Sequence, residues 1–258
     1  MVSISRYSEN VYKINFGKYC VNLVYVKDDA TNSDLWNLLG IYCGELAVVS
    51  TGTDIVGPIR ELGQPDFMGG LHGDEKNKSL VITCDGVQWN EVAEVSATEI
   101  KIVMDSELYR VTTKEHVYDR LIEINITENR IQIINRHECL VDDSVISSAP
   151  TGGLIAVQHT ILKGISMPNY SADVPPSAPV SNRSKDNICG TLYWTDGSIE
   201  VRNILGREKD TYEGNLCVYT KETPMRSKIY LYTIKPTKEG TPMKKGEIIL
   251  GEFEYLFE

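Results

Sequence analysis

Hydrophobic and polar residues alternate with a period of two along most of this chain. In residues 120–126 the isoleucines at 122, 124 and 126 fall on one face, and those at 131 and 133 can oppose them across a turn at 127–129. Successive side chains of a strand point to opposite faces of a sheet. The pattern therefore predicts an antiparallel hairpin with one buried face.

Asp-Gly pairs mark two further hairpins. Asp85-Gly86 follows residues 80–84, and Asp196-Gly197 follows residues 191–195. This dipeptide favours the two-residue type I′ turn that joins antiparallel strands. Other segments rich in β-branched and aromatic residues are also predicted to be strands: 99–104, 153–159, 216–219, 228–234 and 247–255.

Helical patterns are scarce. Residues 33–39 could form two helical turns between the N-cap Ser33 and the stop at Gly40, and residues 54–62 could add one turn. Many short strands with few helices predict an all-β fold, an antiparallel β-sandwich or jelly roll, with a two-sheet supersandwich as the larger variant. We expect a single domain over residues 1–258, with an irregular loop or linker at 168–182.

Composition and net charge limit the kinds of partner that the chain is expected to bind. The formal net charge is -10 and there is no basic stripe, which disfavours binding to nucleic acid. None of the six cysteines forms a C-x-x-C pair, so they are expected to be buried free thiols. No run reaches the ~20 apolar residues of a membrane helix, and the N-terminus lacks the apolar core of a signal peptide. We expect no membrane partner and a cytoplasmic or phage-particle-associated protein.

The candidate catalytic residues are most concentrated in residues 67–75, which have the sequence FMGGLHGDE. Its glycines permit a sharp turn, and His72, Asp74 and Glu75 follow within four positions. A histidine beside carboxylates can transfer protons, with Asp74 or Glu75 orienting it or holding a sugar hydroxyl. The alternative is a solvated turn in which Asp74 caps the backbone through an Asx bond.

The same residues resemble the H-x-x-E zinc segment of the metallocarboxypeptidase and deacylase families. This resemblance implies a zinc hydrolase in which His72, Glu75 and a later histidine, His159, bind the metal. Those families are α/β, and there the motif leads into a helix. Here residues 76–79 lead into a predicted strand, so the favoured prediction contains no metal and no cofactor.

Residues 51–89 carry a wider resemblance. Thr53-Asp54, Gly57-Pro58 and then F-x-G-G-x-H-G ahead of a strand and an Asp-Gly turn are similar to poorly characterised β-rich proteins of gut bacteria, and of phages and prophages of Gram-positive hosts. The resemblance implies a carbohydrate-associated β-sandwich, either in a phage tail or baseplate or in polysaccharide processing.

Tyrosine outnumbers phenylalanine by fourteen to four. A tyrosine ring combines a flat apolar face with a polar tip, which suits stacking on sugar rings. Predicted neighbouring strands could bring four aromatic residues onto one concave, substrate-binding face: Tyr193, Trp194, Tyr230 and Tyr232. Ordinary packing of aromatic residues in strands is the alternative.

Two further residues complete the predicted substrate-binding set. Arg136 closes a strand, where sandwich sites often lie, and His159 alternates with apolar residues on another strand. His116 and His137 stand among charged neighbours, so we expect both to be solvated.

These observations support three hypotheses. The first is a β-sandwich that recognises or processes carbohydrate, by lyase- or glycosidase-like acid/base chemistry if it is catalytic. The second is a non-catalytic phage tail, baseplate or surface-adhesion module that assembles as a homo-oligomer. The third is the zinc hydrolase. Carbohydrate is the expected partner under the first hypothesis.

Overall fold

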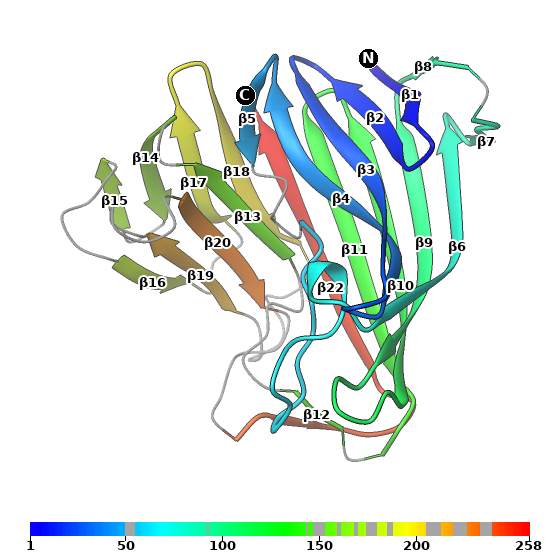
Figure 1. Cartoon of the computed structure of the whole chain (residues 1–258). Helices are drawn as coiled ribbons and strands as arrows, with labels where there is room; N and C mark the ends of the chain where they lie inside the picture. Colours follow the sequence, from blue (N-terminus) through cyan, green and yellow to red (C-terminus); the bar gives the residue numbers. More distant parts are fainter. Residues whose placement is uncertain are drawn as a thin grey trace.

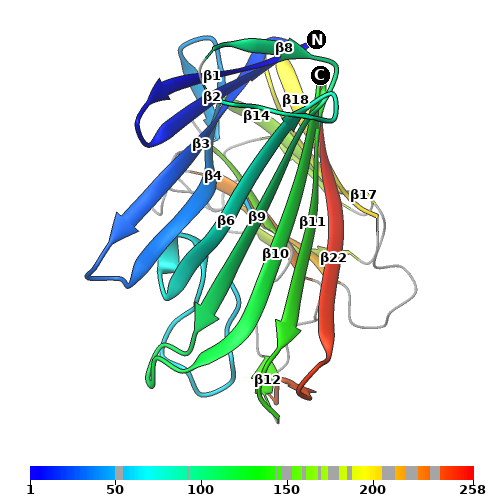
Figure 2. The ribbon, with the colours of Figure 1, turned by 90° about the vertical axis from the view of Figure 1, so that its right-hand side faces the viewer.

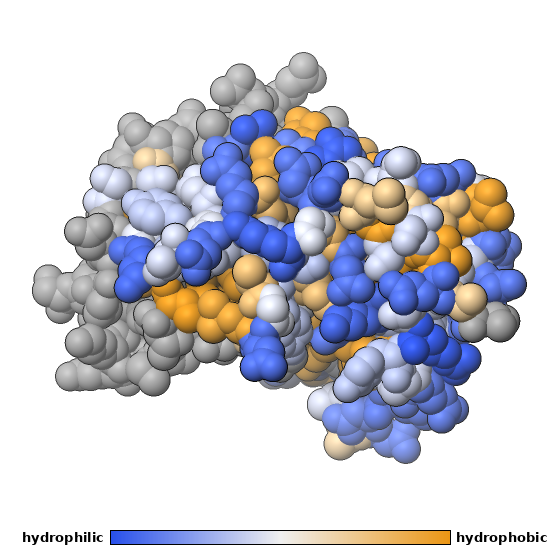
Figure 3. All heavy atoms as spheres, turned by 90° about the horizontal axis from the view of Figure 1, so that it is seen from above, coloured by the Kyte–Doolittle hydropathy of each residue, from blue (hydrophilic) through white to orange (hydrophobic). Residues whose placement is uncertain are grey.

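Strands dominate the computed structural model of this chain, and they pack as two layers (Figure 1). In the space-filling view from above, hydrophobic residues form separate patches between hydrophilic ones (Figure 3). The structure describes residues 1–49, 55–91, 93–142, 144–146, 153–158, 161–167, 170–173, 180–184, 188–204, 213–218, 226–232 and 239–258.

The first sheet is antiparallel throughout, and Figure 2 shows its long central strands side by side. Its last strand in sequence, β22, lies between β11 and β18. In spatial order the sheet contains β6 (Glu75–Cys84), β9 (Ile100–Tyr109), β10 (His116–Thr127), β11 (Arg130–Cys139), β22 (Ile248–Phe257), β18 (Gly197–Asn203), β17 (Ile188–Trp194), β14 (Leu162–Met167) and β15 (Tyr170–Asp173).

The second sheet is also antiparallel. In spatial order it contains β1 (Val2–Ser8), β2 (Val11–Phe16), β3 (Tyr19–Asp28), β4 (Ser33–Cys43), β5 (Leu46–Val49), β13 (Gly153–Gln158), β20 (Arg226–Tyr232), β19 (Glu213–Val218) and β16 (Val180–Ser184). A short parallel pairing of β4 with β6 joins the two sheets.

The remaining elements are short. The strand β8 (Val95–Ala97) pairs with β1, and β7 (Val87–Gln88) pairs with β6. The strands β12 (Ser144–Ile146) and β21 (Thr241–Met243) form a separate pair. The one helical element among the described residues is the 3-10 turn η1 (Gly70–His72), and no helix there is long and apolar enough to cross a membrane.

The core lies between the sheets because alternation turns one face of every long strand inward. Ile102, Ile124 and Ile133 are register partners on β9, β10 and β11, and all three are fully buried. Phe16 of β2 meets Phe257 of β22 edge to face, with ring centroids 5.0 Å apart, which brings the two layers into contact. Each such buried side chain stabilises the fold by about 1.5–3 kcal/mol. The predicted β-sandwich is confirmed.

The hairpins follow the sequence prediction closely. The strands β10 and β11 pair in the predicted register. In the first Asp-Gly turn, Asp85 and Gly86 both have the positive φ (48° and 80°) of a type I′ turn. The other Asp-Gly turn was placed one residue too late: Trp194 pairs with Gly197, so Thr195 and Asp196 form the loop.

The predicted helix at 33–39 is wrong, because these residues belong to β4. Residues 37–41 are buried at every position, and a strand buried on both faces reads as a continuous apolar run that period alone cannot distinguish from a helix. Gly40, at φ 69°, lies where the register with β3 shifts. The predicted turn of helix at 54–62 is also not found over residues 55–62, and β15 and β16 occupy part of the predicted irregular segment 168–182.

Candidate functional site

Polar side chains interrupt the apolar inner face of the first sheet towards one end. Ser106, Arg120 and His137 are register partners on β9, β10 and β11, and Glu75 and Asn135 lie beside them. All five side chains belong to residues that are at most 4% exposed. We call these five residues the polar band.

Arg120 and Glu75 form the centre of the polar band. The guanidinium Nη1 lies 3.0 Å from Glu75 Oε2, and its Nε donates to Asn135 Oδ1 at 3.4 Å. Glu75 also accepts hydrogen bonds from the Ser106 hydroxyl and, at 2.7 Å, from the backbone N–H of Gly70. A buried ion pair is tolerated only when such hydrogen bonds replace the lost water, and here they do.

Residues 55–73, which we call the cover segment, lie over the polar band (Figure 1, cyan). The Gly57 carbonyl accepts from Arg120 Nη2 at 2.8 Å, and Ile59 and Met68 form a backbone bridge. A Cβ on Gly69, at φ 90°, would lie 3.0 Å from Arg120 Nη1. Glycine at 69 therefore allows the close approach of the cover segment to the guanidinium.

A second ion pair anchors the middle of the cover segment. Glu61 is 4% exposed and accepts from Arg110 through both carboxylate oxygens, at 2.7 Å to Nε and 3.1 Å to Nη2. This bidentate geometry is the strong form of an arginine–carboxylate pair. Charged hydrogen bonds thus hold the cover segment in place at Gly57, Glu61 and Gly70.

His137 is the exception within the polar band. It is fully buried, and neither ring nitrogen has a hydrogen-bond partner among the described residues. The ring of Tyr118 meets it edge-on at 6.4 Å. Burial, and then the charge of Arg120, hold the pKa of His137 well below its usual 6.5, so the imidazole is neutral at pH 7. A neutral imidazole has one donor and one acceptor to offer to a ligand.

The predicted trio His72, Asp74 and Glu75 is split by the backbone. His72 is on the surface, 3.4 Å from Asp66, and its ring packs against Phe67. Glu75 belongs to the polar band. The positive φ of Gly73 (86°) and Asp74 (54°) turns successive side chains in different directions, so the expectation that these three residues act together is wrong.

Asp74 has a structural environment. It is buried, and it accepts from Asn32 Nδ2 at 2.8 Å and from Lys114 Nζ at 2.6 Å. Its backbone N–H donates to the Thr31 carbonyl, and its carbonyl accepts from the Tyr109 N–H. Asp74 therefore ties the turn to three neighbouring segments rather than facing a cleft.

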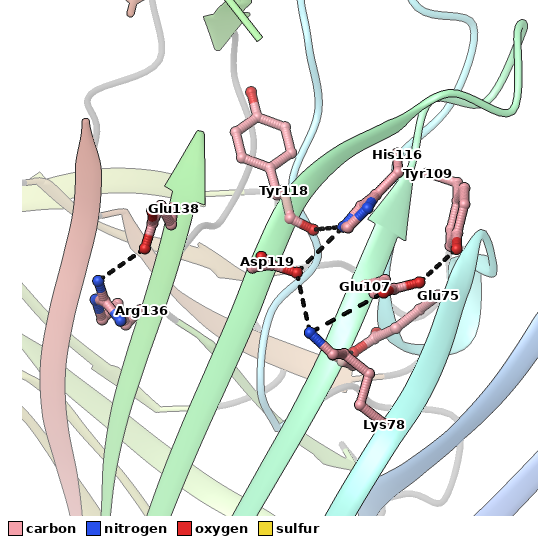
Figure 4. A network of polar contacts seen from close by, with 10 residues as sticks. Glu75, Lys78, Glu107, Tyr109, His116, Tyr118, Asp119, Arg136 and Glu138 are labelled. Carbon is pink, nitrogen blue, oxygen red and sulfur yellow. Dashed lines mark hydrogen bonds and ion pairs between the residues drawn. The ribbon is translucent and has the colours of Figure 1, made fainter. Parts of the chain in front are cut away.

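The zinc arrangement is not supported by the described residues. His72 pairs with Asp66, whereas the Glu75 carboxylate is bonded to Arg120, and His159 lies outside the described residues. One set with metal-ligand geometry does exist in the described part of the chain, on the outer face of the first sheet. It consists of Glu107, His116 and Asp119 (Figure 4).

A lysine already compensates that outer set. Lys78 Nζ lies 3.5 Å from Asp119 Oδ1 and 4.0 Å from Glu107 Oε1, between the two carboxylates (Figure 4). The Tyr109 hydroxyl donates to Glu107, and this bond raises the pKa of Tyr109 to about 12. The carboxylates are thus engaged by groups of the chain itself.

The predicted binding aromatics do not share one face. Trp194 is buried beside Tyr19, whereas the Tyr193 ring covers Gly164 on the opposite side of β17. Consecutive strand residues point to opposite faces, so the grouping of Tyr193 with Trp194 is wrong. Tyr230 and Tyr232 lie on β20, where only the backbone is described.

Arg136 also lies away from the polar band. It is on the outer face of the first sheet and pairs with Glu138 at 2.9 Å (Figure 4). The expectation that His137 is solvated is wrong. Alternate residues of β11 face inward, so Asn135 and His137 lie on the same buried face as Ile131 and Ile133. Extending the alternation by two steps would have revealed the polar band.

Comparison with known proteins shows the fold. No family model and no curated protein sequence matches this chain. A putative aldose 1-epimerase from Escherichia coli K12 superposes with a TM-score of 0.51 and 9% identity, over 96% of this chain and 98% of that one. At this identity the likeness shows a shared β-sandwich fold and no more.

Two longer chains contain a similar sandwich. The galactosidase domain of an α-galactosidase–sucrose kinase has a TM-score of 0.58 and 9% identity, over 99% of this chain and 41% of that one. A glycoside hydrolase family 97 enzyme from Pseudoalteromonas sp. strain K8 has a TM-score of 0.54 and 10% identity, over 98% and 35%. This chain therefore spans about two fifths or less of either protein.

Proposed function

We propose that this chain is a carbohydrate-recognising β-sandwich protein that binds a saccharide at the polar band. The observation that carries the proposal is His137, a fully buried imidazole whose nitrogens have no partner among the described residues. Leaving a buried polar atom unsatisfied costs about 1–3 kcal/mol, so a ligand that satisfies it is favoured.

The chemistry of the polar band suits sugar hydroxyls. A hydroxyl both donates and accepts, and the neutral imidazole of His137 offers one donor and one acceptor to it. Solved neighbours of the same fold support a saccharide, because their names include an aldose 1-epimerase, a galactosidase domain and an enzyme in complex with panose or acarbose. This support is an analogy at the level of the fold.

Binding at the polar band requires the cover segment to move. Gly57 and Gly70 hydrogen-bond to Arg120 and Glu75, so a saccharide that reaches these groups replaces those backbone bonds with its own hydroxyls. If the bound sugar is turned over, His137 is the candidate proton acceptor because its imidazole is neutral, and its lowered pKa makes it a weak base.

A non-catalytic binding module is the second candidate. The similar sandwich makes up 41% of the chain with the galactosidase domain and 35% of the glycoside hydrolase family 97 chain, which favours an accessory, binding role for this fold. Lyase- or glycosidase-like chemistry and association with a phage particle stay predictions.

A glycan array, followed by NMR detection of anomer exchange and of shortened or unsaturated products, tests the proposal. We expect saccharide binding that weakens about tenfold or more in His137→Gln, since one buried hydrogen bond contributes roughly 1–2 kcal/mol. His116→Gln, on the outer face, is the matched control. Binding without turnover would identify the module, and no binding across a broad glycan set would reject the proposal.

A further inference from the structure

The outer face of the second sheet contains a hollow of about 340 Å³. It lies on the solvent side of β2 and β3, opposite the core residues Tyr12, Ile14 and Leu23. We call it the tyrosine hollow, and its lining includes Tyr7, Val11, Lys13, Asn22, Val24 and Tyr42.

Strand register fixes the floor of the tyrosine hollow. Lys13 and Asn22 are direct partners across β2 and β3, and Val11 pairs with Val24 two positions further along. The aliphatic pair therefore lies beside the polar pair on one continuous surface. Among the described residues Lys13 makes no ion pair, and the Asn22 side chain makes no hydrogen bond.

The charge of this surface differs from that of the whole chain. The outward residues of β1 and β2 near the hollow are Ser3, Ser5, Lys13 and Asn15, none of which carries a carboxylate. Lys13 is the only charged residue in the lining, although the formal net charge of the chain is -10. The nearest acids in sequence, Glu9 and Glu45, lie in turns next to lining residues, and neither belongs to the lining itself. A local positive charge within an acidic protein selects an anionic ligand.

Two tyrosines border the hollow. Tyr7, on β1, is 77% exposed, and Tyr42, on β4, is half-buried. The two strands are three strand spacings apart, roughly 14 Å, and the register also offsets the tyrosines along the strands, so a sugar ring can pack on one of them at a time. A tyrosine ring offers a flat apolar face to a sugar and a hydroxyl to its edge.

We propose that the tyrosine hollow binds a saccharide that carries a carboxylate, such as a uronic acid. Its carboxylate accepts hydrogen bonds from Lys13 and Asn22, and its ring packs on Tyr7 or Tyr42 with the valines beneath. This site shares no residue with the polar band, so it goes beyond the function proposed for His137.

An NMR titration of the full chain with glucuronate and trigalacturonate tests this site, with glucose as the uncharged match. We expect the amides of Lys13, Asn22 and Tyr42 to shift, and binding to weaken about tenfold in Lys13→Gln, as for the loss of one exposed charge-assisted contact. Added salt should weaken binding as well. Lys27→Gln is the matched control, because Lys27 is an exposed lysine of β3 outside the lining.

Three results would overturn the proposal. They are the absence of shifts at these amides up to about 10 mM uronate, equal affinity of Lys13→Gln and the unmodified chain, and binding of glucose as tightly as glucuronate. Tyr7→Ser gives a second test, since an exposed side chain is not needed for folding. His137→Gln should leave this titration unchanged, which separates failure here from failure of the polar-band proposal.

Discussion

The inner face of the first sheet has two halves that differ in chemistry and not in burial. In one half Ile102, Ile124 and Ile133 face the second sheet, and in the other Arg120 and its neighbours of the polar band face the cover segment. Both halves are closed to solvent and follow the same alternation. The difference is that apolar side chains need only a matching shape, whereas each buried polar atom needs a specific partner.

The largest effect is expected from breaking the ion pair of the polar half. Arg120→Ala leaves Glu75 as a buried charge without its counterion, which should lower the free energy of unfolding by about 3–5 kcal/mol. Urea denaturation measures this loss. Arg136→Ala, one strand away on the outer face, should change it by less than about 0.5 kcal/mol.

A double variant that makes the polar half apolar tests how much its buried charges matter for stability. Replacing a buried pair with hydrophobic residues of similar volume is often neutral or stabilising, so Arg120→Met with Glu75→Leu should recover most of the loss. If the double variant were as unstable as Arg120→Ala, the hydrogen bonds that the Gly57 carbonyl accepts and the Gly70 N–H donates would matter more than the charge.

The backbone turn at Gly73, which separates His72 from Glu75, should be the next most sensitive feature. A Cβ on Gly73 would lie 2.0 Å from the Thr31 carbonyl oxygen, so Gly73→Ala should cost about 3 kcal/mol. Gly86 has a similar φ, but nothing lies within 4 Å of its Cβ position. Gly86→Ala should therefore cost only about 1 kcal/mol, and equal losses in denaturation would contradict the packing at Gly73.

His137 should give the polar half a pH dependence that the apolar half lacks. Its native pKa lies below the unfolded value of about 6.5, so below that pH the unfolded chain binds more protons than the native protein. Stability should fall as the pH drops from about 6.5 towards the native pKa, by up to about 1.4 kcal/mol per unit. Denaturation of His137→Gln between pH 7.5 and 5.5 should lack this contribution.

The smallest change in stability is expected from a substitution at His72, the histidine that the sequence makes most prominent. It is exposed and paired with the exposed Asp66, so His72→Ala should change the free energy of unfolding by less than about 0.5 kcal/mol. Saccharide affinity should be unchanged too. A loss of binding comparable to that of His137→Gln would show that the glycine-rich loop at 67–75 is part of the binding site.

Local alternation was enough to predict the fold class, the β10–β11 hairpin and one of the two Asp-Gly turns. It failed at β4, where burial on both faces removes the alternation. The sequence alone does not reveal the polar band, because the charged neighbours of His137 suggest a solvated residue, although strand geometry sends those neighbours to the other face. Arg120 stands out only as the start of a predicted strand. The role of Gly73 depends on contact with Thr31, which no local pattern reveals.

The position of β22 has a consequence for how the chain is made. Residues 248–257 pair with β11 on one side and β18 on the other, so they join two groups of strands that are otherwise open at those edges. On the ribosome, both edges stay exposed until residues 248–257 have emerged. Nascent chains should therefore depend on chaperones until β22 is available, and a stop codon introduced before Ile248 should yield an aggregating product.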